Sequence, residues 1–264
     1  MRSVVRAIAV LRALEQGPQS LGRVAQRAGL SKPTVHRLLA SLAHRQMVIQ
    51  NAATGDYMLG PGSLGIADAV MRGVAGLGVF LGPVLDHLGD VTGETVAVYV
   101  RAGLERICIG QVPSTQPVRY TAHVGAAYPL HAGSMGKLLL AYGGDAELRE
   151  LLDRLPLQAL TKATITDRAR LEDELAQIRR RGYATSRGER AAGVASMSAP
   201  IFAADGRILA AIGIIGPDTR LTDEVMARLR PPLLAAAQEV TRQVAGGGRT
   251  WSGVAHRKAR AGAV

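Results

Sequence analysis

The stretch at residues 20–47, SLGRVAQRAGLSKPTVHRLLASLAHRQM, has the pattern of two helices joined by a tight turn. Ser20 stands at the N-cap of the first helix, and Gly29 supplies the permissive turn residue. Ser31 stands at the N-cap of the second helix, and Pro33 lies in its first turn, where a missing backbone donor costs nothing. The stretch therefore predicts a helix-turn-helix, whose second helix normally lies in the major groove of DNA.

The second of these helices has two chemically different faces. Val35, Leu38, Leu39 and Leu42 form an apolar stripe at helical spacing, which we expect to be buried. The other side chains of its first turns are polar or basic, as in a helix that contacts base edges. A small helical bundle with a basic surface is the alternative, but such a bundle does not need a polar, basic first turn here. We therefore predict that DNA is contacted by Ser31, Lys32, Pro33, Thr34, His36, Arg37 and Ser41.

The flanking segments extend this motif to a winged domain over residues 1–60. Upstream, the segment SVVRAIAVLRAL predicts a supporting helix that ends near Gly17 and Pro18. Downstream, the short extended runs VIQ and DYML surround Asn51 and Gly55, which predicts a β-hairpin. Three helices followed by a hairpin make a winged helix-turn-helix. The apolar positions that mark the upstream helix are Val4, Ala7, Ile8, Leu11 and Leu14.

Positive charge is concentrated at the two ends of the chain. The sequence has 32 Lys and Arg against 21 Asp and Glu, a net charge of +11. Residues 1–60 hold eight Lys or Arg against Glu15 and Asp56, whereas the middle of the chain is close to neutral. The Gly-rich segment 246–264 holds four Lys or Arg and no acidic residue. This distribution fits a domain that contacts phosphates plus a basic tail, which we expect to be disordered.

Length and composition limit the remaining classes of protein. A chain of 264 residues with 47% hydrophobic content can form two domains with their own cores. The single cysteine, Cys108, excludes an internal disulfide framework and a Cys-rich zinc site, and its apolar flanks predict a core thiol. Arg12 and Glu15 interrupt the early apolar stretch, and no apolar run reaches membrane-spanning length. We therefore expect no signal peptide, no membrane contact and a cytoplasmic protein.

The rest of the sequence predicts a linker helix and a mixed α/β domain. Residues 61–78, PGSLGIADAVMRGVAGLG, have an apolar face too wide for a lone helix in solvent, so we expect this helix to pack on a second subunit. Strands are predicted at ETVAVYV, ERICIGQV, PVRYTA, GYATS, VASMSAPIF and RILAAIGII. Helices are predicted at GSMGKLLLAY, AELRELLDRL, DRARLEDELAQIRRRG and DEVMARLRPPLLAAAQEVTRQV, the last bent at its Pro-Pro pair. The apolar face of the linker helix comprises Leu64, Ile66, Val70, Met71 and Val74.

These segments, taken in order, resemble the IclR family of bacterial transcriptional regulators over about residues 3–245. The pieces that carry the resemblance are SVVRAIAVLRAL, KPTVHRLLASL, TGDYMLG, TGETVAVYV, YPLHAGSMGKLLLAY, TKATITD, IRRRGYA, GVASMSAPIF and AAIGIIGP. The resemblance implies an α+β fold: a winged helix-turn-helix over 1–60, a linker and dimerisation helix over 61–78, and a GAF-like effector-binding domain with an antiparallel sheet over 79–245. It also implies homodimers, often paired as homotetramers, on palindromic operators in double-stranded DNA.

The resemblance further implies a pocket for a small-molecule effector at the start of the helix near Ser134. Backbone N–H groups at a helix start favour carboxylates. Family members that sense small polar acids tend to carry Asp, Cys and Ser at positions where this pocket is less acidic and more apolar, and Arg187 and Arg190 lie nearby in sequence. We therefore expect an anionic effector, a carboxylate with an apolar or aromatic body. By position, the pocket is lined by Tyr120, Ser134, Met135, Gly136, Ser186, Ser196, Gly213 and Ile215.

Three glycine-containing motifs suggest enzymes instead. GPGSLG at 60–65 spells a dinucleotide-binding motif, but it follows a wing strand rather than opening a βαβ unit. GSMGK at 133–137 is half a P-loop, which would need Gly in place of His131 and Ser or Thr in place of Leu138. AGSMG around Ser134 is one substitution from a nucleophile elbow, although a hydrolase would also need a His and an acid beside it.

The sequence therefore predicts a regulator of transcription and no enzyme. We expect no catalytic residue, no cofactor and no metal site, and a hydrogen-bonded structural role for His131. A small-molecule serine hydrolase fused to a DNA-binding module is the second interpretation. A constitutive architectural DNA-binding protein with an inactive sensor domain is the third.

Overall fold

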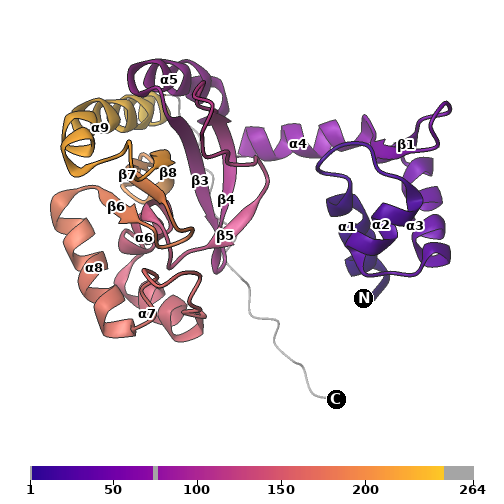
Figure 1. Ribbon diagram of the computed structural model, residues 1–264, viewed down its shortest axis with the longest axis horizontal. Coiled ribbons are helices and arrows are strands. Elements are labelled where there is room, and N and C mark those ends of the chain that lie inside the picture. The colour runs from indigo at the N-terminus through magenta and orange to yellow at the C-terminus, as the bar shows by residue number, and fades with distance from the viewer. Residues whose placement is uncertain (1, 74–76, 247–264) are drawn as a thin grey trace. The chain divides into compact units, whose positions relative to one another are not determined.

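The computed structural model describes residues 2–73 and 77–246, which form two compact units divided between residues 75 and 76 (Figure 1). The predicted disordered segment lies, apart from residue 246, outside the described residues. Across the described ranges, no helix has both the length and the apolar character needed to cross a bilayer.

The first unit is the predicted winged helix-turn-helix. The three helices α1, α2 and α3 enclose a small core that includes Val24, Val35 and Leu39. The β1–β2 hairpin pairs antiparallel, and Tyr57 also bridges to Gln19 ahead of α2, which adds a contact that the sequence did not predict. The elements are α1 (Arg2–Ala13), α2 (Leu21–Ala28), α3 (Lys32–His44), β1 (Val48–Gln50), β2 (Tyr57–Leu59) and α4 (Gly62–Gly73).

Local capping explains why α2 and α3 start and stop where the sequence predicts. The Ser20 Oγ accepts a hydrogen bond from the Arg23 amide at 3.4 Å, and Gly29 ends α2 with a left-handed φ of 64°. Ser31 does occupy the N-cap of α3, but its hydroxyl bonds the Thr34 hydroxyl at 3.0 Å instead of a backbone amide. The predicted N-cap position of Ser31 is therefore right, although its hydroxyl caps no backbone amide.

The apolar pattern of α1 is only partly buried. Val10, Ala13 and Leu14 lie in the core, whereas Val4 and Ile8 are 62% and 48% exposed. The core residues that α1 supplies thus come from its C-terminal half, and apolar side chains in its N-terminal half stay uncovered.

The GPGSLG glycines have a packing role. A Cβ atom at Gly60 would lie 2.2 Å from the Gln46 carbonyl oxygen, and one at Gly62 would lie 2.6 Å from the Arg45 carbonyl oxygen. Gly62 also donates its amide to the Gln46 carbonyl at 2.9 Å. These glycines let α4 leave the hairpin close to the end of α3, and the antiparallel hairpin before them excludes a βαβ unit here.

The second unit is built on an antiparallel sheet whose described strands have the order β5-β4-β3-β8-β7-β6. The central pairing of β3 with β8 sets Val98 opposite Ile212, and the β7–β8 pairing sets Ser196 opposite Ile215. The strands are β3 (Thr95–Ala102), β4 (Glu105–Val112), β5 (Ala127–Pro129), β6 (Ala184–Arg187), β7 (Val194–Phe202) and β8 (Ile208–Pro217).

Helices cover both faces of this sheet. In Figure 1, α5 and α9 lie together on one side, and α6, α7 and α8 lie on the other. Every residue of α6 is buried, because α6 packs between the sheet and α8. The helices are α5 (Leu77–Thr92), α6 (Ser134–Ala141), α7 (Asp145–Arg154), α8 (Arg168–Arg181) and α9 (Asp223–Gly246).

The sequence predictions fail at two places in this unit. PVRYTA is not a strand, because it lies in the irregular connection between β4 and β5, where the Tyr120 carbonyl accepts a hydrogen bond from the Thr95 hydroxyl. Helix α5 was not predicted, and Pro83 in its second turn obscures the helical pattern. The linker helix was predicted over 61–78; α4 covers Gly62–Gly73, α5 begins at Leu77, and residues 74–76 lie outside the described residues.

Gly136 in the first turn of α6 fixes how closely this helix approaches the chain before it. A Cβ atom there would lie 2.2 Å from the Leu130 carbonyl oxygen and 2.6 Å from Arg106 Nη1. We expect Gly136→Ala to lower the free energy of unfolding by about 1–3 kcal/mol, measured by urea denaturation, since a backbone oxygen has to move. Gly82→Ala in α5 is the matched control, because its Cβ meets nothing within 4 Å and the change should be neutral or stabilising. Equal stabilities of the two variants would contradict this packing role.

Candidate functional site

Helix α3 presents a cationic surface in the first unit. Lys32, His36 and Arg37 are exposed, and across the described residues their side chains form no hydrogen bond or ion pair. Together with Leu21 and Pro33 they line an open hollow on this surface. The unpaired cations of Lys32 and Arg37, with the unpaired His36 between them, are suited to contact with DNA phosphates and bases.

Three of the predicted DNA-contacting hydroxyls are engaged within the helix. Ser31 and Thr34 share a hydrogen bond, and the Ser41 hydroxyl donates to the Arg37 carbonyl at 3.0 Å. Thr34 is also half-buried, whereas Ser31, Pro33 and Ser41 are exposed. The cationic side chains are therefore freer to contact DNA than the hydroxyls.

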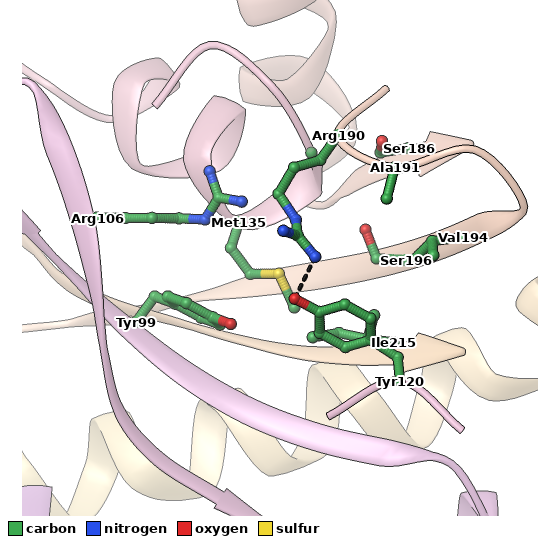
Figure 2. Close-up of a pocket in the computed structure, with 11 residues that line it drawn as sticks. Tyr99, Arg106, Tyr120, Met135, Ser186, Arg190, Ala191, Val194, Ser196 and Ile215 are labelled. Atoms are coloured by element: carbon green, nitrogen blue, oxygen red, sulfur yellow. Dashed lines mark hydrogen bonds between the residues drawn. The ribbon is translucent and has the colours of Figure 1, made fainter. Parts of the chain in front are cut away.

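The second unit contains a small pocket between α6 and the sheet, shown in Figure 2. Its volume is about 20 Å³, which holds roughly one water molecule. The lining comes from segments far apart in sequence: β3, β4, the start of α6, β6, β7, β8 and two loops. The lining residues are Tyr99, Arg106, Tyr120, Gly133, Met135, Ser186, Arg190, Ala191, Val194, Ser196 and Ile215.

The sequence-predicted effector residues divide between the pocket wall and the layer behind it. Ser134 is fully buried behind the wall, and its hydroxyl donates to the Ser196 hydroxyl at 2.8 Å. Gly136 packs against the Leu130 carbonyl, and Gly213 lies under Met135, whose Cε would be 2.4 Å from an added Cβ. The predicted residues on the wall are Tyr120, Met135, Ser186, Ser196 and Ile215.

Arg106 is the main wall residue that sequence reasoning missed. It lies on β4, is 3% exposed, and donates to the carbonyls of Pro129 and Ala132, the latter at 2.9 Å. Burial lowers the pKa of its guanidinium to about 10, although the guanidinium lies over the Tyr99 and Tyr128 rings, each centroid 5.5 Å away. An arginine inside the otherwise apolar run RICIG was the available signal, because a charge in a buried strand needs a reason.

Arg190 is the second guanidinium at this pocket. It lies in the turn between β6 and β7, donates to the Tyr120 hydroxyl, and is 4.8 Å from the centroids of both the Tyr120 and Tyr128 rings. Burial raises the pKa of Tyr120 to about 12, so this hydroxyl stays protonated at neutral pH. Arg187, the other arginine expected near the effector, does not line this pocket, because it pairs with Asp223 at 3.0 Å.

A buried ionic network fixes the elements around the pocket. Lys137 in α6 is 2% exposed and pairs with Glu189 at 2.6 Å and Glu174 at 3.1 Å. The other oxygen of Glu189 accepts the Gly133 amide at 3.0 Å. Lys137 is thus committed to protein carboxylates and is not placed as the lysine of a P-loop.

The chemistry around Ser134 is not that of a nucleophile. Among the described residues, its hydroxyl partners are the Ser196 hydroxyl and the Met135 sulfur, and neither is a base. His131 is buried, and its Nε2 lies 2.9 Å from the Gln158 carbonyl oxygen, which is a structural contact.

A winged helix-turn-helix whose recognition helix carries unpaired cationic side chains, joined in one chain to an α/β domain with a small pocket, defines a DNA-binding regulator of transcription. Residues 3–52 match the IclR helix-turn-helix domain, and residues 76–242 match the family described as bacterial transcriptional regulator IclR, C-terminal. The chain belongs to the IclR family of bacterial transcriptional regulators. The family and fold predicted from the sequence are confirmed.

Known relatives align over most of the chain. The transcriptional repressor IclR of Escherichia coli (strain K12) is 34% identical over 245 residues, which cover 91% of this chain and 89% of the repressor. The regulator BhcR of Paracoccus denitrificans is 33% identical over 222 residues, covering 84% of this chain and 79% of BhcR. The crystal structure of a transcriptional regulator from Rhodococcus sp. RHA1 superposes with a TM-score of 0.79 at 29% identity, covering 94% of this chain and all of that one. These similarities support a transcriptional regulator and not a hydrolase.

Proposed function

We propose that this protein binds a palindromic operator as a homodimer and that a small carboxylate in the α6 pocket modulates the affinity for DNA. The observation that carries the effector part is the convergence of two guanidiniums, from Arg106 and Arg190, on one pocket. No Asp or Glu occurs among the lining residues, all of which are described. A site with excess positive charge, Tyr hydroxyls and apolar walls suits an anion with an apolar body.

The effector site in this proposal comprises Tyr120, Met135, Ser186, Ser196 and Ile215 on the wall. Ser134 and Gly213 support it from behind, because Ser134 orients the Ser196 hydroxyl and Gly213 makes room for Met135. Gly136 joins them as a packing residue of α6.

The proposed protein has no enzymatic activity of its own. Support comes from Ser134, whose hydroxyl is bonded to another hydroxyl rather than to a histidine. The partner of the proposed regulator is genomic DNA, so the protein acts in the bacterial cytoplasm. A constitutive architectural DNA-binding protein is the competing proposal, and DNA affinity that no ligand changes would favour it.

The DNA part of the proposal rests on α3. We expect Arg37→Ala to weaken binding by about 1–3 kcal/mol if Arg37 contacts a base edge. The measurement is fluorescence anisotropy on a duplex that the parent protein selects from a random pool, at matched salt. Arg207→Ala in the second unit removes the same charge from an exposed Arg–Asp pair and should leave DNA affinity unchanged. Equal affinities of Arg37→Ala and the parent would contradict the assignment.

The dimer part rests on α4. Leu64 and Ile66 are 69% and 59% exposed, an uncovered apolar pair suited to a second subunit. The side chains of Val70, Met71 and Val74, predicted on the same face, lie outside the described residues.

We expect the double variant Leu64→Lys and Ile66→Lys to weaken dimerisation at least about tenfold, because each buried apolar side chain contributes roughly 1.5–3 kcal/mol. Sedimentation velocity at micromolar concentration measures this. Val118→Lys with Val124→Lys is the matched control, since these residues of the second unit are 70% and 61% exposed. A monomeric parent, or a Leu64 and Ile66 variant that sediments like the parent, would refute the role of α4.

A further inference from the structure

The pocket holds more positive charge than its surroundings neutralise. Arg106 and Arg190 repel each other, and this repulsion adds to burial in lowering the pKa of Arg106. The adjacent acid, Glu189, has one oxygen on Lys137 and the other on the Gly133 amide. Two guanidiniums therefore face one small space without a carboxylate from the described chain.

Arg106 is the fixed member of this pair. Its Nη1 is held by two backbone carbonyls, and Gly133 and Gly136 close on its guanidinium. Its Nε is buried and has no hydrogen-bond partner among the described residues. A buried guanidinium donor without an acceptor is costly unless a ligand supplies one.

Arg190 is the movable member. Its side chain is only half-buried, and its described contacts are the Tyr120 hydroxyl and the rings of Tyr120 and Tyr128. Figure 2 shows the Arg190 guanidinium reaching into the space between Arg106 and Tyr120.

The free volume is too small for an organic ligand. A cavity that binds benzene has a volume of roughly 150 Å³, whereas this one has about 20 Å³. A ligand can enter only where a side chain leaves, and the half-buried Arg190 is held in the pocket by side chains alone, those of Tyr120 and Tyr128. Its planar guanidinium already stacks on aromatic rings, so a planar ring fits the place that it vacates.

We propose that the Arg190 side chain is a displaceable occupant of the pocket and also the group that recognises the ligand. The ring of an aromatic monocarboxylate replaces the Arg190 guanidinium against Tyr120 and Tyr128. The carboxylate of the ligand then lies between the displaced Arg190 guanidinium and the Arg106 Nε. This inference rests on the proposed function, since it assumes that the pocket binds the effector. Arg190 thus both fills the pocket when no ligand is bound and selects a negatively charged ligand.

Two probes of the same shape, benzoate and neutral benzamide, test this by calorimetric titration of the full chain. The parent should prefer benzoate, whose carboxylate pairs with both guanidiniums. Arg190→Ala should weaken benzoate binding by about tenfold or more, the range expected for a lost charged hydrogen bond. The same variant should bind benzamide more tightly than the parent does, because no guanidinium has to be displaced.

Arg187→Ala is the matched control, because it removes an arginine from the adjacent strand that does not line this pocket. Its affinities for both probes should equal those of the parent. If Arg190→Ala binds benzoate as the parent does, or if its benzamide affinity falls, the role of Arg190 is wrong while a carboxylate effector still stands. If the parent binds neither probe, an aromatic monocarboxylate is not the ligand and the inference fails. The proposed DNA binding is tested independently by the affinity of the Arg37→Ala variant for DNA.

Discussion

The buried ion pair between Lys137 and Glu189 joins the segments that meet at the pocket. Lys137 lies in α6, and Glu189 lies in the turn that also carries Arg190. Glu174 brings α8 to the same ammonium group, and the Thr164 hydroxyl donates to the Glu189 carbonyl at 2.6 Å. Moving the Lys137 or Glu189 segment away would leave a buried charge without its partner, which is costly. These contacts therefore hold α6, the Glu189 turn, α8 and the Thr164 segment in a single arrangement.

This arrangement also explains why the pocket is cationic. One oxygen of the Glu189 carboxylate binds Lys137 and the other accepts the Gly133 amide at the start of α6. This carboxylate therefore does not neutralise the guanidinium of Arg190. The same hydrogen bond to Gly133 uses a donor at the helix start that would otherwise be offered to a ligand. In the proposed function, recognition of an anion rests on the side chains of Arg106 and Arg190.

Local signals made the first unit predictable from sequence, and long-range packing limited the prediction of the second. Caps and turns such as Ser20 and Gly29 act within a few residues, so they located α2 and α3 closely. The place of Arg106 depends instead on carbonyls more than twenty residues away, and PVRYTA lies in an irregular connection whose Tyr120 carbonyl accepts a hydrogen bond from the distant Thr95 hydroxyl. Ser134 was predicted to line the pocket, but its hydroxyl is turned toward Ser196 on β7. That contact joins residues 62 positions apart, so local sequence does not reveal it.

A double-mutant comparison at Lys137 and Glu189 tests this account most directly. Urea denaturation of the full chain should show that Glu189→Gln loses roughly 3 kcal/mol of unfolding free energy, the low end for a broken buried pair because Glu174 still faces Lys137. Adding Lys137→Met should recover most of this loss, because no buried charge is then left unpaired. A Glu189→Gln variant within about 0.5 kcal/mol of the parent, or a double variant no more stable than the single one, would contradict the claim that this pair holds the pocket together.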